Sequence, residues 1–439
     1  MFHGASPDAS AFGSLAASIR DVQLPNPETP VMRRSTSLLV GFLLCTCVVA
    51  IVWATADNES AEGQGGLPGA RAVIDAADYP SLQAALDALP DEGGLVRLPP
   101  GEFVIDQPIV LRRGDACIEG SGTATHIKNV NTDGQPALIL EHPEGANSRK
   151  KEMWRIRLAN FRITGNPKSG HGIEARRINE IFVDGVTVSY HGGDGIQLFF
   201  CYEDPRICDC LITYNKGTGV NLIGCHDIVV SACQFEENQD ALHCMDGFNL
   251  TMSGNALDDH LGHGVVIENT YGSVVAANMI EECNGTAIVL DRDCYGITIS
   301  ANVIAHDGAG VDLRDAHGCA VSANTFTIMK TDAVRIGPAS GRIAVTGNSF
   351  CDSYIGEGKL KRAEKDRAAA GMVLEAASDV AVAGNTFSGV LPKAVELRGE
   401  SSRRVAFIGN VLTDVVSDHE ALQESVVSDN VLNAAVKPE

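Results

Sequence analysis

The sequence predicts an all-β fold, a single parallel β-helix in which the chain winds through many similar coils. Three observations predict it: a repeat of about 23 residues, an asparagine at a fixed place in most repeats, and 45 glycines among 439 residues. Repeats of this length are too short for helix pairs or propeller blades. They fit one coil of a β-solenoid, with short strands separated by tight turns.

Each repeat contains a small residue followed by an apolar, a variable and an apolar residue. The small residues are Gly172, Gly195, Gly219, Ala241, Gly264, Ala287, Gly310, Ala333, Gly371 and Ala394. Because side chains alternate along a strand, the apolar residues are expected to point inward and the variable residue outward. The recurring asparagines predict a ladder of amide hydrogen bonds at one turn: Asn255, Asn278, Asn302, Asn324, Asn348, Asn385 and Asn410.

The N-terminal part has a different composition. Residues 1–36 are expected to be a disordered extension, residues 37–56 a signal-peptide apolar region or a transmembrane helix, and residues 57–72 a linker. Arg33 and Arg34 precede the apolar run, and Ala54-Thr55-Ala56 has the pattern of a cleavage site. The run is also long enough to span a bilayer. Both alternatives predict an exported body, secreted, periplasmic or at the cell surface, that contacts a membrane only through an uncleaved N-terminal segment.

Charge and cysteine content restrict the partners. Asp and Glu total 56 against 34 Lys and Arg, a net charge of -22, which excludes nucleic acid because a phosphate backbone needs a basic surface. Cys210 and Cys233 fall at the ladder position, and Cys201 and Cys225 share another register. Stacked buried thiols are favoured over a zinc site, whose ligands converge on a tetrahedron. A Cys201–Cys225 disulfide is the alternative in an oxidising compartment.

Residues 79–90 (YPSLQAALDALP) predict a short amphipathic helix that caps the first coil, with Pro80 in its first turn and Leu82, Leu86 and Leu89 on one face. Together with GGLVRLPPGEFVI (residues 93–105) and the asparagine-laddered coils, this opening resembles the pectate-lyase superfamily of right-handed parallel β-helices. The resemblance covers residues 73–435. It implies a right-handed β-helix over that range and a polysaccharide partner. Members include lyases, hydrolases, uronate epimerases and non-catalytic binders, so fold alone does not choose among them. We expect a monomer.

Polar residues concentrate on the outward rows of residues 240–335, where stacked strands would form a groove. The predicted catalytic residues are Asp240, His263, Glu268 and Asp291, and the predicted substrate-binding residues are His243, Asp312, Arg314 and Arg335. Glu268 and Asp291 are expected to be neighbours in one row, about 5 Å apart. Paired carboxylates at that spacing suit glycoside hydrolysis through a covalent intermediate.

Elimination or uronate epimerisation would instead need a base and a positive charge near the uronate carboxyl group. His263 or His243 would supply the base. Arg314 or Arg335 would supply the charge. A Ca²⁺ ion held by Asp291 and Asp312 is the other source, and it is the one cofactor the sequence suggests.

The segment Gly262-His263-Gly264, with Asp240 one coil earlier, is similar to motifs of polygalacturonases. The sequence departs from that family at three places: Gln239 stands where the second Asp of a pair is expected, Thr218 replaces an earlier Asp, and Arg335 is not followed by Lys. Only His263 and Asp240 carry over.

Two further features leave the function open. An insertion before Gly371 contains five basic residues, Lys359, Lys361, Arg362, Lys365 and Arg367, and predicts either a helical flap that recruits an anionic sugar or a solvated helix. Val266 and Val289 interrupt the polar outward row. The leading hypothesis is a carbohydrate-active enzyme acting by hydrolysis, elimination or epimerisation. The alternative is a non-catalytic β-helix that binds glycan or a protein partner.

Overall fold

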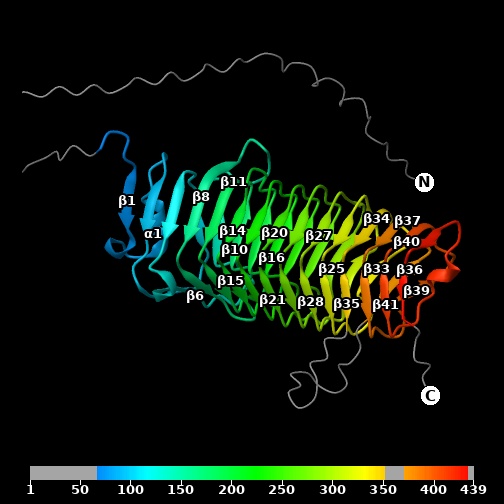
Figure 1. Cartoon of the computed structure of the whole chain (residues 1–439). Helices are drawn as coiled ribbons and strands as arrows, with labels where there is room; N and C mark the ends of the chain where they lie inside the picture. The colour runs from blue at the N-terminus through cyan, green and yellow to red at the C-terminus, as the bar shows by residue number, and fades with distance from the viewer. Residues whose placement is uncertain (1–66, 352–369, 434–439) are drawn as a thin grey trace, which may run out of the picture. The chain divides into compact units, whose positions relative to one another are not determined.

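The computed structural model describes residues 67–351 and 370–433, and in them the chain forms a parallel β-solenoid with three sheets (Figure 1). Strands that pair with one another in each sheet come from successive coils and stack along the solenoid. The 12-stranded sheet consists of β4 (Ile109–Leu111), β7 (Leu138–Leu140), β10 (Ile173–Arg176), β13 (Ile196–Phe199), β16 (Val220–Ile223), β19 (Leu242–Met245), β22 (Val265–Glu268), β25 (Thr286–Asp291), β29 (Ala309–Leu313), β33 (Val334–Ile336), β36 (Met372–Glu375) and β39 (Val395–Arg398).

The other two sheets complete each coil. The 17-stranded sheet consists of β1 (Ala72–Asp75), β2 (Gly94–Arg97), β5 (Ala116–Glu119), β8 (Met153–Ala159), β11 (Ile178–Asp184), β14 (Arg206–Cys208), β17 (Val229–Ser231), β20 (Thr251–Ser253), β23 (Val274–Ala276), β26 (Cys294–Tyr295), β27 (Thr298–Ser300), β30 (Ala316–His317), β31 (Ala320–Ser322), β34 (Gly341–Thr346), β37 (Ser378–Ala383), β40 (Arg403–Ile408) and β42 (Val426–Ser428). The 14-stranded sheet consists of β3 (Gly101–Ile105), β6 (Thr125–Asn129), β9 (Arg162–Thr164), β12 (Thr187–Ser189), β15 (Leu211–Thr213), β18 (Gln234–Glu236), β21 (Ala256–Asp258), β24 (Met279–Glu281), β28 (Val303–Ala305), β32 (Thr325–Thr327), β35 (Ser349–Cys351), β38 (Thr386–Ser388), β41 (Val411–Thr413) and β43 (Val431–Leu432).

The register of the 12-stranded sheet confirms the predicted outward row. Its members pair in parallel from coil to coil in this order: Glu174, Gln197, Asn221, His243, Val266, Val289, Asp312, Arg335, Val373 and Glu396. The flanking apolar residues of the triplets are buried, except Leu397 in the last one, which is partly buried. The small residue before each strand is explained by close approach to the next coil. A Cβ at Gly219, for example, would lie 2.7 Å from the carbonyl oxygen of Ala241.

The asparagine ladder is present. Asn278 donates its side-chain N–H to Oδ1 of Asn302 at 3.0 Å, and Asn302 repeats this bond to Asn324 at 3.0 Å. The residue before each ladder asparagine has a positive φ, such as 55° at Ala301, and this turns the amide inward. Cys233 stands at the ladder position, as predicted, because its backbone N–H donates to Oδ1 of Asn255.

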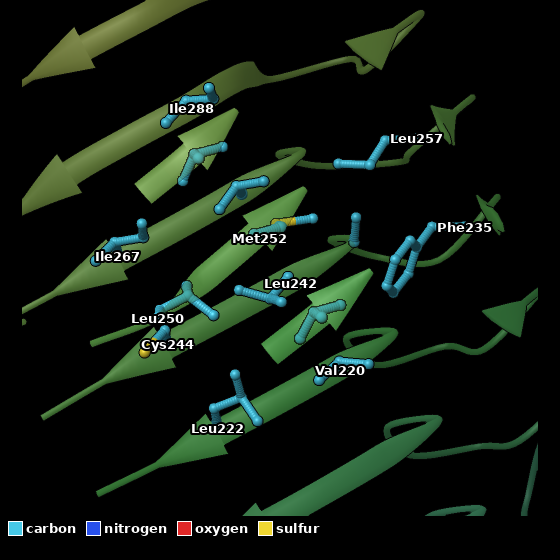
Figure 2. Packing of buried hydrophobic residues seen from close by; sticks show 14 of the residues in the cluster. Val220, Leu222, Phe235, Leu242, Cys244, Leu250, Met252, Leu257, Ile267 and Ile288 are labelled. Carbon is cyan, nitrogen blue, oxygen red and sulfur yellow. The ribbon is translucent and has the colours of Figure 1, made fainter. Parts of the chain in front are cut away.

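The interior is filled by apolar side chains from all three sheets. Figure 2 shows part of it, with Leu222 and Leu242 from the 12-stranded sheet, Met252 from the 17-stranded sheet, and Phe235 and Leu257 from the 14-stranded sheet. All five are fully buried. The cysteines of the described residues are free thiols, and most of them are buried in this core.

The predicted N-terminal helix is α1 (Leu82–Asp87), which begins later than Tyr79. Ser81 is its N-cap and accepts the backbone N–H of Ala84, so Pro80 precedes the cap and does not lie in the first turn. The helix lies against β4. There the Gln83 side chain both accepts the N–H of Val110 at 2.8 Å and donates to its carbonyl at 3.1 Å, as a neighbouring strand would.

Short 3₁₀ helices complete the described elements: η1 (Ala76–Asp78), η2 (Gly122–Ala124) and η3 (His419–Ala421). None of the helices in residues 67–351 and 370–433 is long and apolar enough to cross a membrane. The predicted extension 1–36, the apolar segment 37–56, most of the linker 57–72 and the basic insertion lie outside the described residues.

Candidate functional site

The outer face of the 12-stranded sheet, here called the site face, carries the predicted polar residues. Its central contact joins His243 on β19 to Glu268 on β22, with 2.9 Å between Nε2 and Oε2. Both side chains are largely buried, with 26% and 20% of their surface exposed. Arg292, which follows β25, places a guanidinium nitrogen 3.5 Å from the same carboxylate oxygen. A carboxylate at Nε2 fixes the ring and leaves Nδ1 to accept a proton.

Glu268 and Asp291 are register partners on β22 and β25, as predicted. Each carboxylate contacts a different arginine: Glu268 contacts Arg292, and Asp291 lies 3.6 Å from Arg314. A glycosidase acid must hold a proton, and a neighbouring guanidinium favours the charged carboxylate. The two arginines therefore favour the charged form of both carboxylates, which argues against paired-carboxylate hydrolysis even though Glu268 and Asp291 are neighbours.

Asp312 is on β29, and Arg314 directly follows that strand. Nε of Arg314 lies 2.8 Å from a carboxylate oxygen of Asp312. Arg314 thus contacts both carboxylates predicted to hold Ca²⁺, Asp291 and Asp312. A calcium ion would have to displace this guanidinium, so the pair as arranged does not fit the ion. Calcium binding here stays a prediction.

Arg335 lies further along the site face on β33. Its Nε donates to Glu375 on β36 at 3.1 Å. The ion pair links two consecutive strands of the sheet, and it lies away from the His243–Glu268 contact in the register. Substrate binding by Arg335 stays a prediction.

Asp240 and His263 lie at the turn that enters the strands of the site face, and both are bound to backbone. Oδ1 of Asp240 accepts the N–H of His263 at 2.5 Å, and Nδ1 of His263 accepts the N–H of Thr286 at 2.9 Å. A neutral His263 therefore carries its proton on Nε2 and has no lone pair free for base catalysis. These contacts resemble the asparagine ladder, because each side chain accepts a hydrogen bond from a backbone N–H of the next coil.

The glycine of the Gly-His-Gly segment has a packing reason. A Cβ at Gly262 would lie 2.4 Å from Oδ1 of Asp240, so a larger residue would break the contact between that carboxylate and the turn. The motif thus follows from the turn geometry, and the predicted catalytic roles of Asp240 and His263 remain untested.

Sequence reasoning missed Arg292 and a polar network around Asp194. Arg292 follows the end of its strand with a φ of 57°, a position outside the rows that alternation defines. Asp194 accepts from the amides of Gln197 at 3.3 Å and Asn221 at 3.0 Å. Gln197 and Asn221 both belong to the predicted outward row, so their places in that row could have pointed to the network around Asp194.

Comparison with known proteins supports the fold. The sequence model of the family described as right handed beta helix region matches residues 116–265 and 171–326. No curated protein sequence matches the chain significantly. The A-module of the mannuronan C-5 epimerase AlgE6 of Azotobacter vinelandii is similar in structure, with a TM-score of 0.53 and 18% identity over 83% of this chain and 100% of that one.

Two further solved structures are similar at low identity. A mutant of the periplasmic alginate epimerase AlgG has a TM-score of 0.52 and 11% identity over 83% of this chain and 84% of its own. A mutant tailspike of E. coli bacteriophage HK620, in complex with a pentasaccharide, has a TM-score of 0.53 and 14% identity over 77% of this chain and 63% of its own. Likeness at this identity shows the fold alone. The family match, the register and the ladder agree, and the chain is a right-handed parallel β-helix protein that fits the pectate-lyase superfamily.

Proposed function

We propose that the chain is an exported protein that acts on a uronate-containing polysaccharide at the site face. The observation that carries the proposal is the His243–Glu268 contact with Arg292 beside it. A histidine held by a carboxylate is a suitable general base, and its Nδ1 has no hydrogen-bond partner among the described residues. The names of two similar structures, both epimerases of uronate polymers, support the substrate class.

The chemistry we propose is removal of the proton on the carbon next to the uronate carboxyl group. Nδ1 of His243 takes this proton, and Arg292, whose only ion pair in the described chain is the 3.5 Å contact, faces the carboxylate that gains negative charge. Return of a proton from solvent to the opposite face of that carbon gives epimerisation. Elimination follows instead when the bond from the adjacent carbon to the glycosidic oxygen breaks, a C=C bond forms, and the released chain end takes a proton from solvent as a hydroxyl group. Val266 lies next to His243 in the same row and is partly exposed, so it offers an apolar surface for a sugar ring, whereas Val289 beside it is buried.

The test is incubation of the purified chain with mannuronan, polygalacturonate and mixed uronate polymers in D₂O. Deuterium gain at the uronate carbon reports proton exchange, absorbance at 235 nm reports unsaturated products, and reducing ends report hydrolysis. The His243→Gln and Glu268→Gln variants should lose roughly 10²–10⁴-fold of the activity, which is what a positioned acid–base group contributes. Parallel reactions with EDTA and with added calcium test the predicted metal.

A matched control lies at the end of two strands of the 14-stranded sheet, where His306, just after β28, contacts Glu282, just after β24, at 2.7 Å. Because this pair is on a different face, Glu282→Gln should leave turnover unchanged. Equal losses from the Glu268 and Glu282 variants would argue against a catalytic role for the site face, and no turnover on any uronate polymer would refute the proposal.

The second candidate is a non-catalytic glycan-binding surface. The backbone contacts of Asp240 and His263 favour it, because they give these residues a structural purpose. His263→Ala would distinguish the two contributions: a structural residue lowers the melting temperature, whereas a catalytic residue lowers turnover at an unchanged melting temperature. Binding without turnover by the unmodified chain would establish this second candidate.

A further inference from the structure

The site face has a pocket N-terminal to the His243–Glu268 contact that sequence reasoning did not find. It has a volume of about 410 Å³ and is lined by Ala146, Asn147, Glu174, Arg176, Gln197 and Phe199. Its size falls in the range of small-ligand sites. Gln197 is two coils before His243 in the same outward row, so the two places lie on one line along the sheet, roughly 10 Å apart at the strand spacing.

The pocket is formed where the connection between β7 and β8 is long. The floor comes from β10 and β13, and residues 141–152 provide the wall through Ala146 and Asn147. Nε of Arg177 donates to the carbonyl of Ala146 at 3.0 Å and ties the wall to the sheet. The corresponding connection after β10 is the single residue Arg177, so the wall is a local addition to the coil.

The charges in the pocket are already balanced. Glu174 is 4% exposed and makes a close ion pair with Arg176. Arg176 also lies 3.6 Å from Glu141. Arg112 lies 3.8 Å from Glu141 as well, so two guanidinium groups balance two carboxylates. No unpaired positive charge is left in this cluster for an anionic ligand, whereas carboxylate oxygens can accept hydrogen bonds from hydroxyl groups.

Phe199 adds an apolar surface beside these polar groups. It is half-buried, and its ring packs edge-to-face on Phe200 with 4.5 Å between the centroids. The amide of Gln197 is oriented by its bond to Asp194 at 3.3 Å. An aromatic ring next to fixed hydrogen-bonding groups suits a ligand with one C–H face and several hydroxyl groups.

We propose that this pocket is a binding subsite for an uncharged hexopyranose unit of the polysaccharide. Its C–H face lies on Phe199, and its hydroxyl groups bind Glu174 and Gln197. The inference rests on the proposed function, because the same glycan chain continues to His243, where a uronate unit reacts. The preferred substrate is therefore a mixed polymer in which a neutral sugar lies near the reacting uronate.

The test is calorimetric titration of the full chain with mannohexaose, galactohexaose, glucohexaose and the hexauronates of mannuronate and galacturonate. At least one neutral hexaose should bind. Phe199→Ala should weaken that binding roughly tenfold or more, whereas Phe199→Tyr should retain it because the ring remains. Phe248→Ala is the matched control. Its ring is 40% exposed and stacks on Tyr271, away from the pocket.

The results separate the two proposals. Neutral-sugar binding that depends on Phe199 supports the subsite even if no uronate polymer is turned over, in which case only the proposed chemistry fails. Turnover of uronate polymers without any neutral-hexaose binding overturns the subsite and leaves the chemistry. Equal weakening by Phe199→Ala and Phe248→Ala also overturns the subsite.

Discussion

Asp307 is a carboxyl group in the interior of the solenoid, at the turn after β28. Its Oδ1 accepts the backbone N–H of Cys283 at 2.9 Å, and its Oδ2 has no hydrogen-bond partner within the described chain. Burial raises the pKa of Asp307 well above its usual value. Asn238 occupies the same place three coils earlier and donates its amide to the carbonyl of Ile212 at 2.8 Å. This turn position recurs from coil to coil as a column of residues, and an amide side chain fits the column better than a carboxyl group.

We predict that Asp307→Asn stabilises the protein at neutral pH by about 1–3 kcal/mol, because it removes an unsatisfied buried group and adds a donor. The wild-type carboxyl has a raised pKa in the folded state. Its contribution to stability is present below about pH 4 and is lost as pH rises. Urea denaturation at pH 4.5 and 8 should show an advantage of the variant that grows with pH. Asp106→Asn, at an exposed carboxyl, should show no such growth.

At the scale of the elements, substitution of a single asparagine in the ladder should lower the free energy of unfolding strongly. Asn302→Ala leaves both the backbone and the side-chain N–H of Asn278 without their acceptor. Two buried donors without partners should lower the free energy of unfolding by roughly 2–6 kcal/mol. Asn430→Ala removes the same bonds from Asn410, but at the last, partly exposed position of the ladder, where water can replace them. Chemical denaturation should therefore show a smaller loss for Asn430, and equal losses would contradict the cooperative ladder.

The repeat made the strands and their register predictable because an error of one residue would turn every side chain to the other face. The apolar triplets and the ladder, read at about 23 residues per coil, thus placed Glu268 beside Asp291. The column that contains Asn238 and Asp307 was missed, since its members differ in residue type. The start of α1 was missed because the Ser81 cap outweighed the apolar pattern.

The candidate site was less predictable than the fold. Row positions fix the direction of Cβ but not the partner that a long side chain reaches, so the contact of Arg292 with Glu268 could not be read from the repeat. Asp240 and His263 have reactive side chains, yet hydrogen bonds to the next coil occupy them. The pocket wall comes from an irregular connection, and a repeat carries no information about such a segment.

At the scale of the whole molecule, the net charge of -22 is concentrated in part on the 14-stranded sheet. Glu236, Asp258 and Glu281 are register partners there, and Asp259 and Glu282 follow their strands. Burial, followed by the nearby carboxylates, raises the pKa of Asp258 to about 6. Its stabilising contribution is therefore complete below about pH 4 and is lost as pH rises through 6.

We predict that Asp258→Asn leaves the melting temperature unchanged at pH 4 and raises it at pH 7.5, because the variant removes one of several repelling charges. Added NaCl should raise the melting temperature of the wild type more than that of the variant, since salt screens the remaining repulsion. Asp379→Asn provides a control of opposite sign: the Arg404 guanidinium lowers the pKa of Asp379 to about 2, so its removal should lower the melting temperature at pH 7.5. Parallel pH profiles for the wild type and Asp258→Asn would show that the acidic sheet face does not limit stability, and the charge would then act only on solubility.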